Sequence, residues 1–389
     1  MNRGQRKRLR VATPILLIVV VATVLVATLR AHHASPRPKP VPPPTALPHL
    51  KAQHPRVVPV SRLLGQLIVG RFDGTRPSRR FMERVKSGHL GAVILFSENT
   101  AGGLASVRGF DQRLQRAARS GGNPRLLIMT DQEGGAVRRL AGAPALAPAE
   151  MSSASVARTQ GLMTGRLLRS ADIDVDLAPV ADVESPQVPS FLGSRSFGTA
   201  PQMVAERACA FAQGLVTGRV AYTLKHFPGL GLASTSTDAA PVTVSEPASL
   251  LHEDDLPYRH CGSGPLALTM VDSASYPTLM GGLPAVVTAA TYARELPNAV
   301  PGLVPVTISD NLEAPALADV RSPGLQAIRS GLDLAMYATS EHGSATAYKM
   351  LLAAFRRHRL GLARIEDAAV RVEQLKRQLG RRSDSRSRG

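Results

Sequence analysis

Eight short apolar runs, rich in β-branched residues, recur along the body of the chain. They lie at residues 66–69, 91–96, 125–130, 174–180, 220–225, 265–271, 304–310 and 332–337. Most intervals between them are long enough for a helix, and residues 201–218 carry apolar side chains at a 3.6-residue period. Near-continuous apolar strands that alternate with amphipathic helices are typical of a parallel sheet covered by helices.

This alternation predicts an α/β fold with a single closed barrel. Eight strand and helix units over about 320 residues fit a (β/α)8 barrel of the TIM type. An open sheet of about six or seven strands is the alternative, because short strands are easily miscounted. Active sites of such barrels lie at the C-terminal ends of the strands. Polar residues follow these runs at Glu98, Asn99, Asp131, Gln132, Glu133, Asp182, Lys225, His226, Asp272 and Asp310.

Three segments at these strand ends carry candidate chemistry. TDQEGGAVRRL places Asp131 before two glycines that permit a sharp turn, although an Asp here could simply cap that turn. LKHFPGLG places Lys225 beside His226, and two cations crowded beside a carboxylate-lined pocket indicate ligand binding. The alternative is a regular strand, along which these two side chains would point to opposite faces. VTISDNLEAPAL ends its strand on Asp310, which fits either a nucleophilic carboxylate or a helix N-cap completed by Glu313.

The net charge of +18 is concentrated at the ends of the chain. Residues 1–56 hold about ten Lys or Arg and no acid, and residues 381–389 add about three net charges, which leaves the body near +5. Nucleic-acid binding is therefore not expected, since no base-stacking aromatic pattern accompanies the charge. A basic segment at 1–10 followed by an uncharged apolar run at 11–29 predicts a single-pass membrane anchor with the barrel on the extracytoplasmic side. A cleaved signal peptide is the alternative.

Residues 30–56 are rich in proline and predict a stiff spacer between the anchor and a barrel at 57–380. A basic tail at 381–389 follows the barrel.

Cys209 and Cys261 are the only cysteines, and either a disulfide or two buried thiols is consistent with the sequence. The body contains no GxSxG, P-loop, CxxC or GxGxxG motif. No cofactor is expected, and no metal, because no second His stands at ligand spacing from His226.

Taken in order along the chain, the segments resemble the N-terminal barrel of family 3 glycoside hydrolases. The similarity is closest to the single-domain bacterial β-N-acetylhexosaminidases that trim peptidoglycan fragments. The segments are LLGQLIVGRF, GAVILFSENT, TDQEGGAVRRL, DLAPVADV, SRSFG, KHFPGLG, LTMVDSASYP, TISDNLE and RVEQLKRQLG.

This resemblance implies roles for individual residues. Asp131 and Arg139 would hold ring hydroxyls of the terminal sugar, and Arg195, Lys225 and His226 would hold its other substituents. Asp310 would be the nucleophile of a retaining, double-displacement reaction.

The chain departs from the family pattern in the loop after KHFPG. The hexosaminidase branch carries a catalytic Asp and His in a DSH motif there, whereas Asp238 is followed by Ala239 and Ala240. Leu230 also replaces a family His. Asp238 alone, or one of His252, Glu253 and Asp254, could serve as the general acid.

The sequence therefore predicts a membrane-anchored glycosidase acting on β-linked N-acetylhexosamine-type sugars of cell-wall carbohydrate. A catalytically impaired sugar-binding protein and a β-glucosidase-like enzyme of the same fold are the alternatives.

Overall fold

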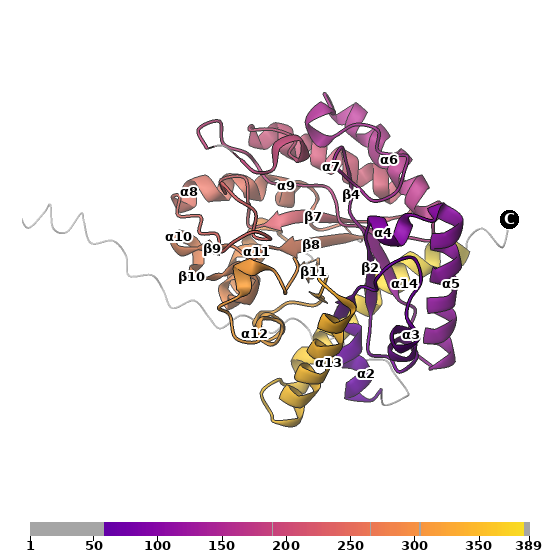
Figure 1. Ribbon diagram of the computed structural model, residues 1–389. Helices are drawn as coiled ribbons and strands as arrows, with labels where there is room; N and C mark the ends of the chain where they lie inside the picture. Colours follow the sequence, from indigo (N-terminus) through magenta and orange to yellow (C-terminus); the bar gives the residue numbers. More distant parts are fainter. Residues whose placement is uncertain (1–57, 189, 265, 303–304, 385–389) are drawn as a thin grey trace, which may run out of the picture. The chain divides into compact units, whose positions relative to one another are not determined.

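The eight apolar runs form one parallel sheet in the computed structural model, which describes residues 58–188, 190–264, 266–302 and 305–384 (Figure 1). The strands are β1 (Ile68–Gly70), β2 (Ala92–Leu95), β3 (Leu127–Thr130), β6 (Val175–Asp176), β7 (Ala221–Phe227), β8 (Ala267–Val271), β11 (Val306–Ser309) and β12 (Ala335–Met336). Their order is β11-β8-β7-β6-β3-β2-β1-β12, with parallel pairing throughout. A parallel bridge from Ile308 to Leu334 joins the two ends of this order. The predicted closed barrel is therefore confirmed, and the open-sheet alternative is wrong.

Helices connect the strands, and most of them cover the outside of the barrel (Figure 1). They are α2 (Val60–Gln66), α3 (Arg79–Lys86), α4 (Ser97–Thr100), α5 (Gly103–Ser120), α6 (Ala154–Ser170), α7 (Pro201–Thr217), α8 (Ala248–Leu251), α9 (Asp255–Cys261), α10 (Pro277–Met280), α11 (Leu296–Ala299), α12 (Pro323–Ser330), α13 (Glu341–Arg356) and α14 (Leu362–Asp384). Helix α7 confirms the helix predicted at 201–218. It packs closely on α6 because Gly161 has no Cβ, which would lie 2.1 Å from the Phe211 carbonyl oxygen.

Shorter elements occupy the connections. Two antiparallel pairs are β4 (Gln132–Gly134) with β5 (Val137–Arg138), and β9 (Ser275–Tyr276) with β10 (Gly281–Pro284). Single turns of 3-10 helix are η1 (Pro148–Glu150), η2 (Gly193–Arg195), η3 (His252–Asp254), η4 (Ala285–Val287) and η6 (Pro315–Leu317), and η5 (Thr291–Glu295) is a π-helical turn. The β4–β5 pair and η2 carry residues of the site described below.

Alternation along the strands divides the core into an inner and an outer layer. In β2, Ile94 belongs to the cluster inside the barrel, and its neighbour Val93 belongs to the cluster beneath the helices. Helix α14 adds Val372 and Leu375 to the inner cluster. Its Lys376 donates hydrogen bonds to Gln66 and to the Gly91 carbonyl, which lie just before β1 and β2. Helix α14 therefore closes the N-terminal end of the barrel and leaves the opposite end for the site.

Cys209 and Cys261 form a disulfide with a Cα–Cα distance of 5.6 Å. The bond joins α7 to the end of α9, two helices that also pack against each other. Of the two readings that the sequence left open, the disulfide is the one found in the structure.

The predicted segments 1–10, 11–29 and 30–56 lie outside the described residues. Among the helices that are described, none is long and apolar enough to cross a membrane.

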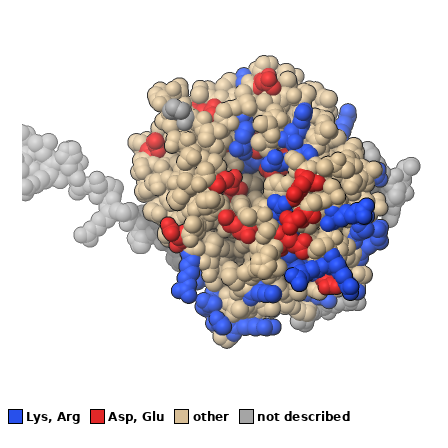
Figure 2. Space-filling view, in the orientation of Figure 1, with Lys and Arg blue, Asp and Glu red and all other residues tan. Residues whose placement is uncertain are grey.

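On the face of the molecule in Figure 2, acidic and basic side chains intermix around the middle, and Lys and Arg gather along the lower edge.

Candidate active site

A cavity of about 270 Å³ opens at the C-terminal end of the barrel, and all seven residues singled out from the sequence line it. They are Asp131, Arg139, Arg195, Lys225, His226, Asp238 and Asp310. The apolar part of the wall includes Ile94, Met270 and Met336, which point into the barrel from β2, β8 and β12. The polar residues therefore surround a small space above the inner core.

Two cations and two carboxylates form a buried network on one side of the cavity. The Lys225 amino group lies 2.8 Å from Asp131 Oδ1 and 2.6 Å from Glu133 Oε1. Arg195 donates two hydrogen bonds to Glu133, of 2.8 and 2.9 Å. Glu133 and Lys225 are almost fully buried, whereas Asp131 and Arg195 are partly exposed to the cavity. Charge is thus balanced inside the network, and two of its members remain free to contact a ligand.

The network keeps Glu133, Lys225 and Arg195 ionised. Burial alone would raise the pKa of Glu133, but the charges of Lys225 and Arg195 outweigh burial and lower it to about 2. Burial would likewise lower the pKa of Lys225, but the charges of Asp131 and Glu133 raise it above its ordinary value. The ammonium and the guanidinium are therefore permanent hydrogen-bond donors facing the cavity.

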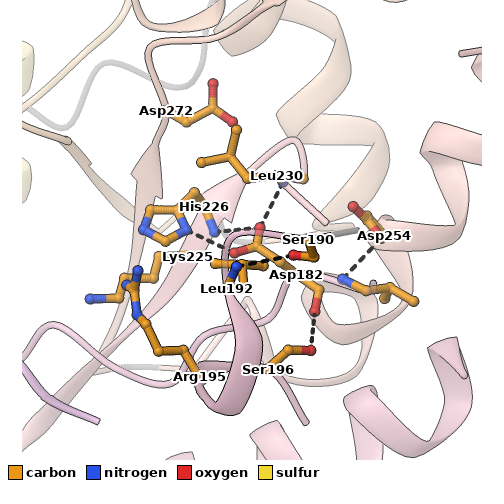
Figure 3. A network of polar contacts seen from close by, with 12 residues as sticks. Asp182, Ser190, Leu192, Arg195, Ser196, Lys225, His226, Leu230, Asp254 and Asp272 are labelled. Carbon is orange, nitrogen blue, oxygen red and sulfur yellow. Dashed lines mark hydrogen bonds and ion pairs between the residues drawn. The ribbon is translucent and has the colours of Figure 1, made fainter. Parts of the chain in front are cut away.

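His226 is held by Asp182, a fully buried carboxylate that follows β6. Asp182 Oδ2 lies 2.8 Å from Nδ1 of the His226 ring, and Oδ1 accepts hydrogen bonds from the backbone N–H groups of His226 and Leu230. Burial would raise the pKa of Asp182, but His226 and these hydrogen bonds lower it. Figure 3 shows the His226 ring and the side chains of Lys225 and Arg195 extending to the same side of Asp182.

Lys225 and His226 both line the cavity, as the ligand-binding interpretation requires, so the alternative in which they point to opposite faces is wrong here. The pairing of β7 with β8 shifts register between Leu224 and Phe227. Regular alternation is lost at such an irregularity, and two adjacent side chains can then face the same space.

Asp310 follows β11 directly and is half-buried at the cavity wall. Its Oδ1 accepts a 2.7 Å hydrogen bond from the Asn311 backbone N–H. The capping-box interpretation is wrong, because no helix begins directly after Asp310 and Glu313 instead accepts a hydrogen bond from the Thr339 N–H. A carboxylate placed at the wall in this way is available for attack on a bound ligand.

Asp238 lies on the loop after β7 and reaches the same cavity. Its backbone N–H bonds to Ser236 Oγ at 3.1 Å, and the neighbouring Thr237 carbonyl accepts from the Ala316 N–H. Desolvation at the wall and then the charge of Asp310 raise the pKa of Asp238. The environment of Asp238 therefore favours the protonated form of its carboxyl more than water would.

Arg139 is positioned by the turn that Gln132 organises. The Gln132 side chain accepts a hydrogen bond from the Arg139 backbone N–H and donates to the carbonyls of Leu140 and Ala143. The guanidinium of Arg139 lies over the Phe96 ring, 5.6 Å from its centre, and 4.0 Å from Asp131. Its remaining donors are therefore available near Asp131.

The other candidates for a general acid do not reach the cavity. His252 pairs with Asp255, and the carboxyl of Asp254 is buried and accepts a hydrogen bond from the Val183 N–H. His226 is the one histidine among the described residues that line the cavity. Within the same described ranges, no group of three or more His, Cys, Asp or Glu side chains is arranged to hold a metal ion.

Sequence reasoning gave no role to two residues that organise the site, Glu133 and Asp182. Both are acids that follow predicted strands, and that position was the available signal. Their role depends on which cation each one meets, and the sequence does not specify that.

Comparisons with known proteins show the family to which the chain is similar. The sequence model described as "Glycosyl hydrolase family 3 N terminal domain" matches residues 60–375. The β-hexosaminidase LpqI of Mycobacterium tuberculosis is 30% identical over 362 residues, which is 90% of each chain. An "uncharacterized secreted glycosyl hydrolase" of Arthroderma benhamiae is 28% identical over 330 residues, covering 81% of this chain and 92% of that protein.

Solved structures give the same relationship in three dimensions. A family 3 β-N-acetylglucosaminidase from a Paenibacillus species is similar with a TM-score of 0.77 and 28% identity, over 83% of this chain. The match spans 63% of that longer protein. The structure of M. tuberculosis LpqI has a TM-score of 0.73 and 27% identity, covering 82% of this chain and 94% of LpqI.

Proposed function

This chain belongs to glycosyl hydrolase family 3, and we propose that it is a glycosidase that cleaves β-linked N-acetylhexosamine-type sugars with retention of configuration. The observation that carries the proposal is the pair of carboxyls, Asp310 and Asp238, at the wall of one small cavity. Desolvation and then the charge of Asp310 raise the pKa of Asp238. A retaining glycosidase needs one carboxyl as nucleophile and a second carboxyl that donates a proton.

In the proposed first step, Asp310 attacks the anomeric carbon while the bond to the leaving oxygen breaks. Asp238 gives its proton to that oxygen, and a covalent glycosyl ester forms on Asp310. In the second step, Asp238 removes a proton from water, which attacks the same carbon and releases Asp310. Asp238 would thus do alone what the hexosaminidase branch does with an Asp and a His.

The polar network would bind the sugar. Asp131 and Arg139 are proposed to hold ring hydroxyls, and Arg195, Lys225 and His226 to hold the other substituents. Support comes from their donors and acceptors, which converge on the cavity, and from a cavity volume suited to a single sugar unit. The preference for an N-acetyl group rests on the relatives, since LpqI and the Paenibacillus enzyme are described as a β-hexosaminidase and a β-N-acetylglucosaminidase.

We also propose that the barrel works outside the cell membrane on cell-wall carbohydrate, held by an anchor at residues 11–29. Support comes from the apolar run, the proline-rich segment that follows it, and the Cys209–Cys261 disulfide. Disulfides persist mainly in oxidising compartments outside the cytosol.

Hydrolysis of 4-nitrophenyl β-glycosides that differ only at the 2-position tests the substrate proposal. The full-length chain is expected to cleave the 2-acetamido sugar faster than the glucoside, and Asp310→Asn to abolish both activities. Asp319→Asn, the same substitution at an exposed site, serves as the control. Faster hydrolysis of the glucoside than of the 2-acetamido sugar would favour the β-glucosidase alternative.

A second candidate is a sugar-binding protein with little turnover, because Ala240 and Leu230 stand where the hexosaminidase branch carries histidines. Saturable binding of N-acetylglucosamine to the folded chain, with no release of nitrophenol from either glycoside, would favour it.

A further inference from the structure

The Tyr276 hydroxyl and the buried Asp272 carboxyl contact each other next to the loop that carries Asp238. Asp272 follows β8, and Tyr276 lies on β9 a few residues later. The Tyr276 hydroxyl lies 2.5 Å from Asp272 Oδ2 and 2.8 Å from the Gly229 carbonyl oxygen. Gly229 belongs to the turn at the start of that loop. The Tyr276–Gly229 hydrogen bond therefore links Asp272 to the loop that carries Asp238.

The three oxygens constrain where the protons lie. A carbonyl oxygen only accepts, and a tyrosine hydroxyl has one proton to donate. If Tyr276 donates to Gly229, then the oxygen that faces Tyr276 from Asp272 must carry a proton of its own. If Asp272 is ionised, Tyr276 must donate to the carboxylate, and the buried Gly229 carbonyl loses this hydrogen bond.

The surroundings of Asp272 favour the first arrangement. Asp272 and Tyr276 are fully buried, and no Lys, Arg or His of the described ranges forms an ion pair with Asp272. The titratable groups that act on Asp272 or feel its charge include Asp182, Asp310, Tyr258, Tyr276 and Tyr292. Each of these groups is acidic. Burial, above all, raises the pKa of Asp272 well above its ordinary value and outweighs the opposite effect of the Ala274 N–H, which donates to the other carboxyl oxygen, Oδ1.

The turn requires a glycine at position 229. Its φ of +148° lies in the region that favours glycine, and a Cβ there would lie 1.7 Å from Asp254 Oδ2. The next residue, Leu230, donates its N–H to Asp182. The turn is therefore fixed by the Asp182 carboxyl at one residue and by Tyr276 at the residue before it.

We propose that Asp272 is a positioning residue that keeps its proton in the folded protein and donates it to Tyr276, which donates to Gly229 and fixes the Asp238 loop. Its effect on catalysis rests on the proposed function, in which Asp238 is the acid. Asp272 touches neither the sugar nor the reacting atoms and acts through Tyr276. The protonated Asp272 carboxyl then serves as a hydrogen-bond donor, and the side-chain amide of an asparagine can take its place.

The first test concerns the proton alone and needs no activity. The urea midpoint of the full-length chain is compared with that of Asp272→Asn between pH 4 and pH 8. A carboxyl whose folded pKa is raised contributes stability that is present below its unfolded pKa and lost as pH rises through the folded value. The midpoint of the native chain should therefore fall relative to Asp272→Asn as pH rises. Parallel curves across this range would overturn the proposal.

The second test concerns the loop and uses aryl glycosides with good and poor leaving groups, since only the poor ones need the acid. Asp272→Asn keeps a donor towards Tyr276 and should retain both rates within about twofold. Tyr276→Phe and Asp272→Leu should lower the rate on poor leaving groups by about tenfold or more, with a smaller effect on good ones. Tyr222→Phe is the matched control, because that buried hydroxyl bonds to the Cys261 carbonyl outside the loop.

An unchanged leaving-group dependence in folded Tyr276→Phe would contradict the positioning role. If the native chain hydrolyses nothing, the proposed function fails, but the urea comparison still decides whether Asp272 holds its proton.

Discussion

The Lys225 amino group lies 2.6 Å from Glu133 Oε1, although both side chains are almost fully excluded from solvent. Lys225 also contacts Asp131, and Glu133 also binds Arg195. Each buried charge therefore has an opposite charge beside it, which such groups need in a low-dielectric interior. Glu133 makes no proposed contact with the sugar, and its role is to fix the two cations that do.

Replacing Lys225 with Met should destabilise the protein strongly, because Glu133 loses a buried partner and Asp131 loses its nearest cation. Loss of one member of a buried ion pair typically costs about 3–5 kcal/mol in the free energy of unfolding. Urea unfolding at neutral pH measures the change. Lys349→Met, at an exposed position on α13, should change the same free energy by less than about 0.5 kcal/mol. A similar small loss for both variants would contradict the proposed network.

Replacing Asp238 with Asn should slow hydrolysis according to the leaving group. A fall of about 10²- to 10⁴-fold is expected for alkyl or phenyl glycosides, and a smaller one for dinitrophenyl glycosides, which leave without a proton. Because the pKa of Asp238 is raised, the acid form persists to higher pH, and the native rate should decline as pH rises through that value. The variant should lack this decline. Equal effects on all leaving groups would argue for a structural role instead.

The disulfide should matter for stability rather than for chemistry. Cys209 and Cys261 are separated by 52 residues. In the chain-entropy model, a disulfide that closes a loop of this length adds about 4 kcal/mol to the free energy of unfolding. The double variant with serine at both positions should unfold at lower urea and keep its KM for aryl glycosides, because neither cysteine lines the cavity. A changed KM would show that the α7–α9 contact reaches the site.

Lys376 predicts a pH-dependent stability at the closed end of the barrel. Burial, above all, lowers its pKa to about 7, and its amino group donates to Gln66 and to the Gly91 carbonyl. A lysine whose folded pKa is depressed contributes stability that is present above its unfolded pKa, near 10.5, and lost as pH falls towards the folded value.

Lys376→Met should therefore gain stability over the native chain as pH falls from about 10 to 7, by up to about 1.4 kcal/mol per pH unit. Below pH 7 the difference should stay constant. Urea unfolding at several pH values measures it, with Lys349→Met as the control. A difference that does not vary with pH would contradict the depressed pKa.

The strands and the strand-end residues could be predicted because burial leaves a plain signal in the sequence. Residues such as Val93 and Ile94 are covered on both faces of the sheet, so the strand is a continuous apolar run. Parallel strands bring their C-terminal ends to one edge, so Asp131, Lys225 and Asp310 had to lie near one another.

Other features depend on contacts between distant parts of the chain. The direction of His226 follows from a register shift, and the pairing of Cys209 with Cys261 follows from how α7 packs on α9. The role of Glu133 depends on Arg195, which is 62 residues away in the chain. Such facts are settled by tertiary packing, which no local pattern encodes.

The most direct test of the central claim is mass spectrometry of the folded, full-length chain after exposure to a 5-fluoro N-acetylglucosaminyl fluoride. Such a sugar has a good leaving group and accumulates a glycosyl ester when a retaining nucleophile is present, whether or not the acid functions. We predict one added sugar on the peptide that contains Asp310, and none in Asp310→Asn. The absence of an adduct on the native chain, or an adduct on another carboxylate such as Asp131, would contradict the proposed mechanism.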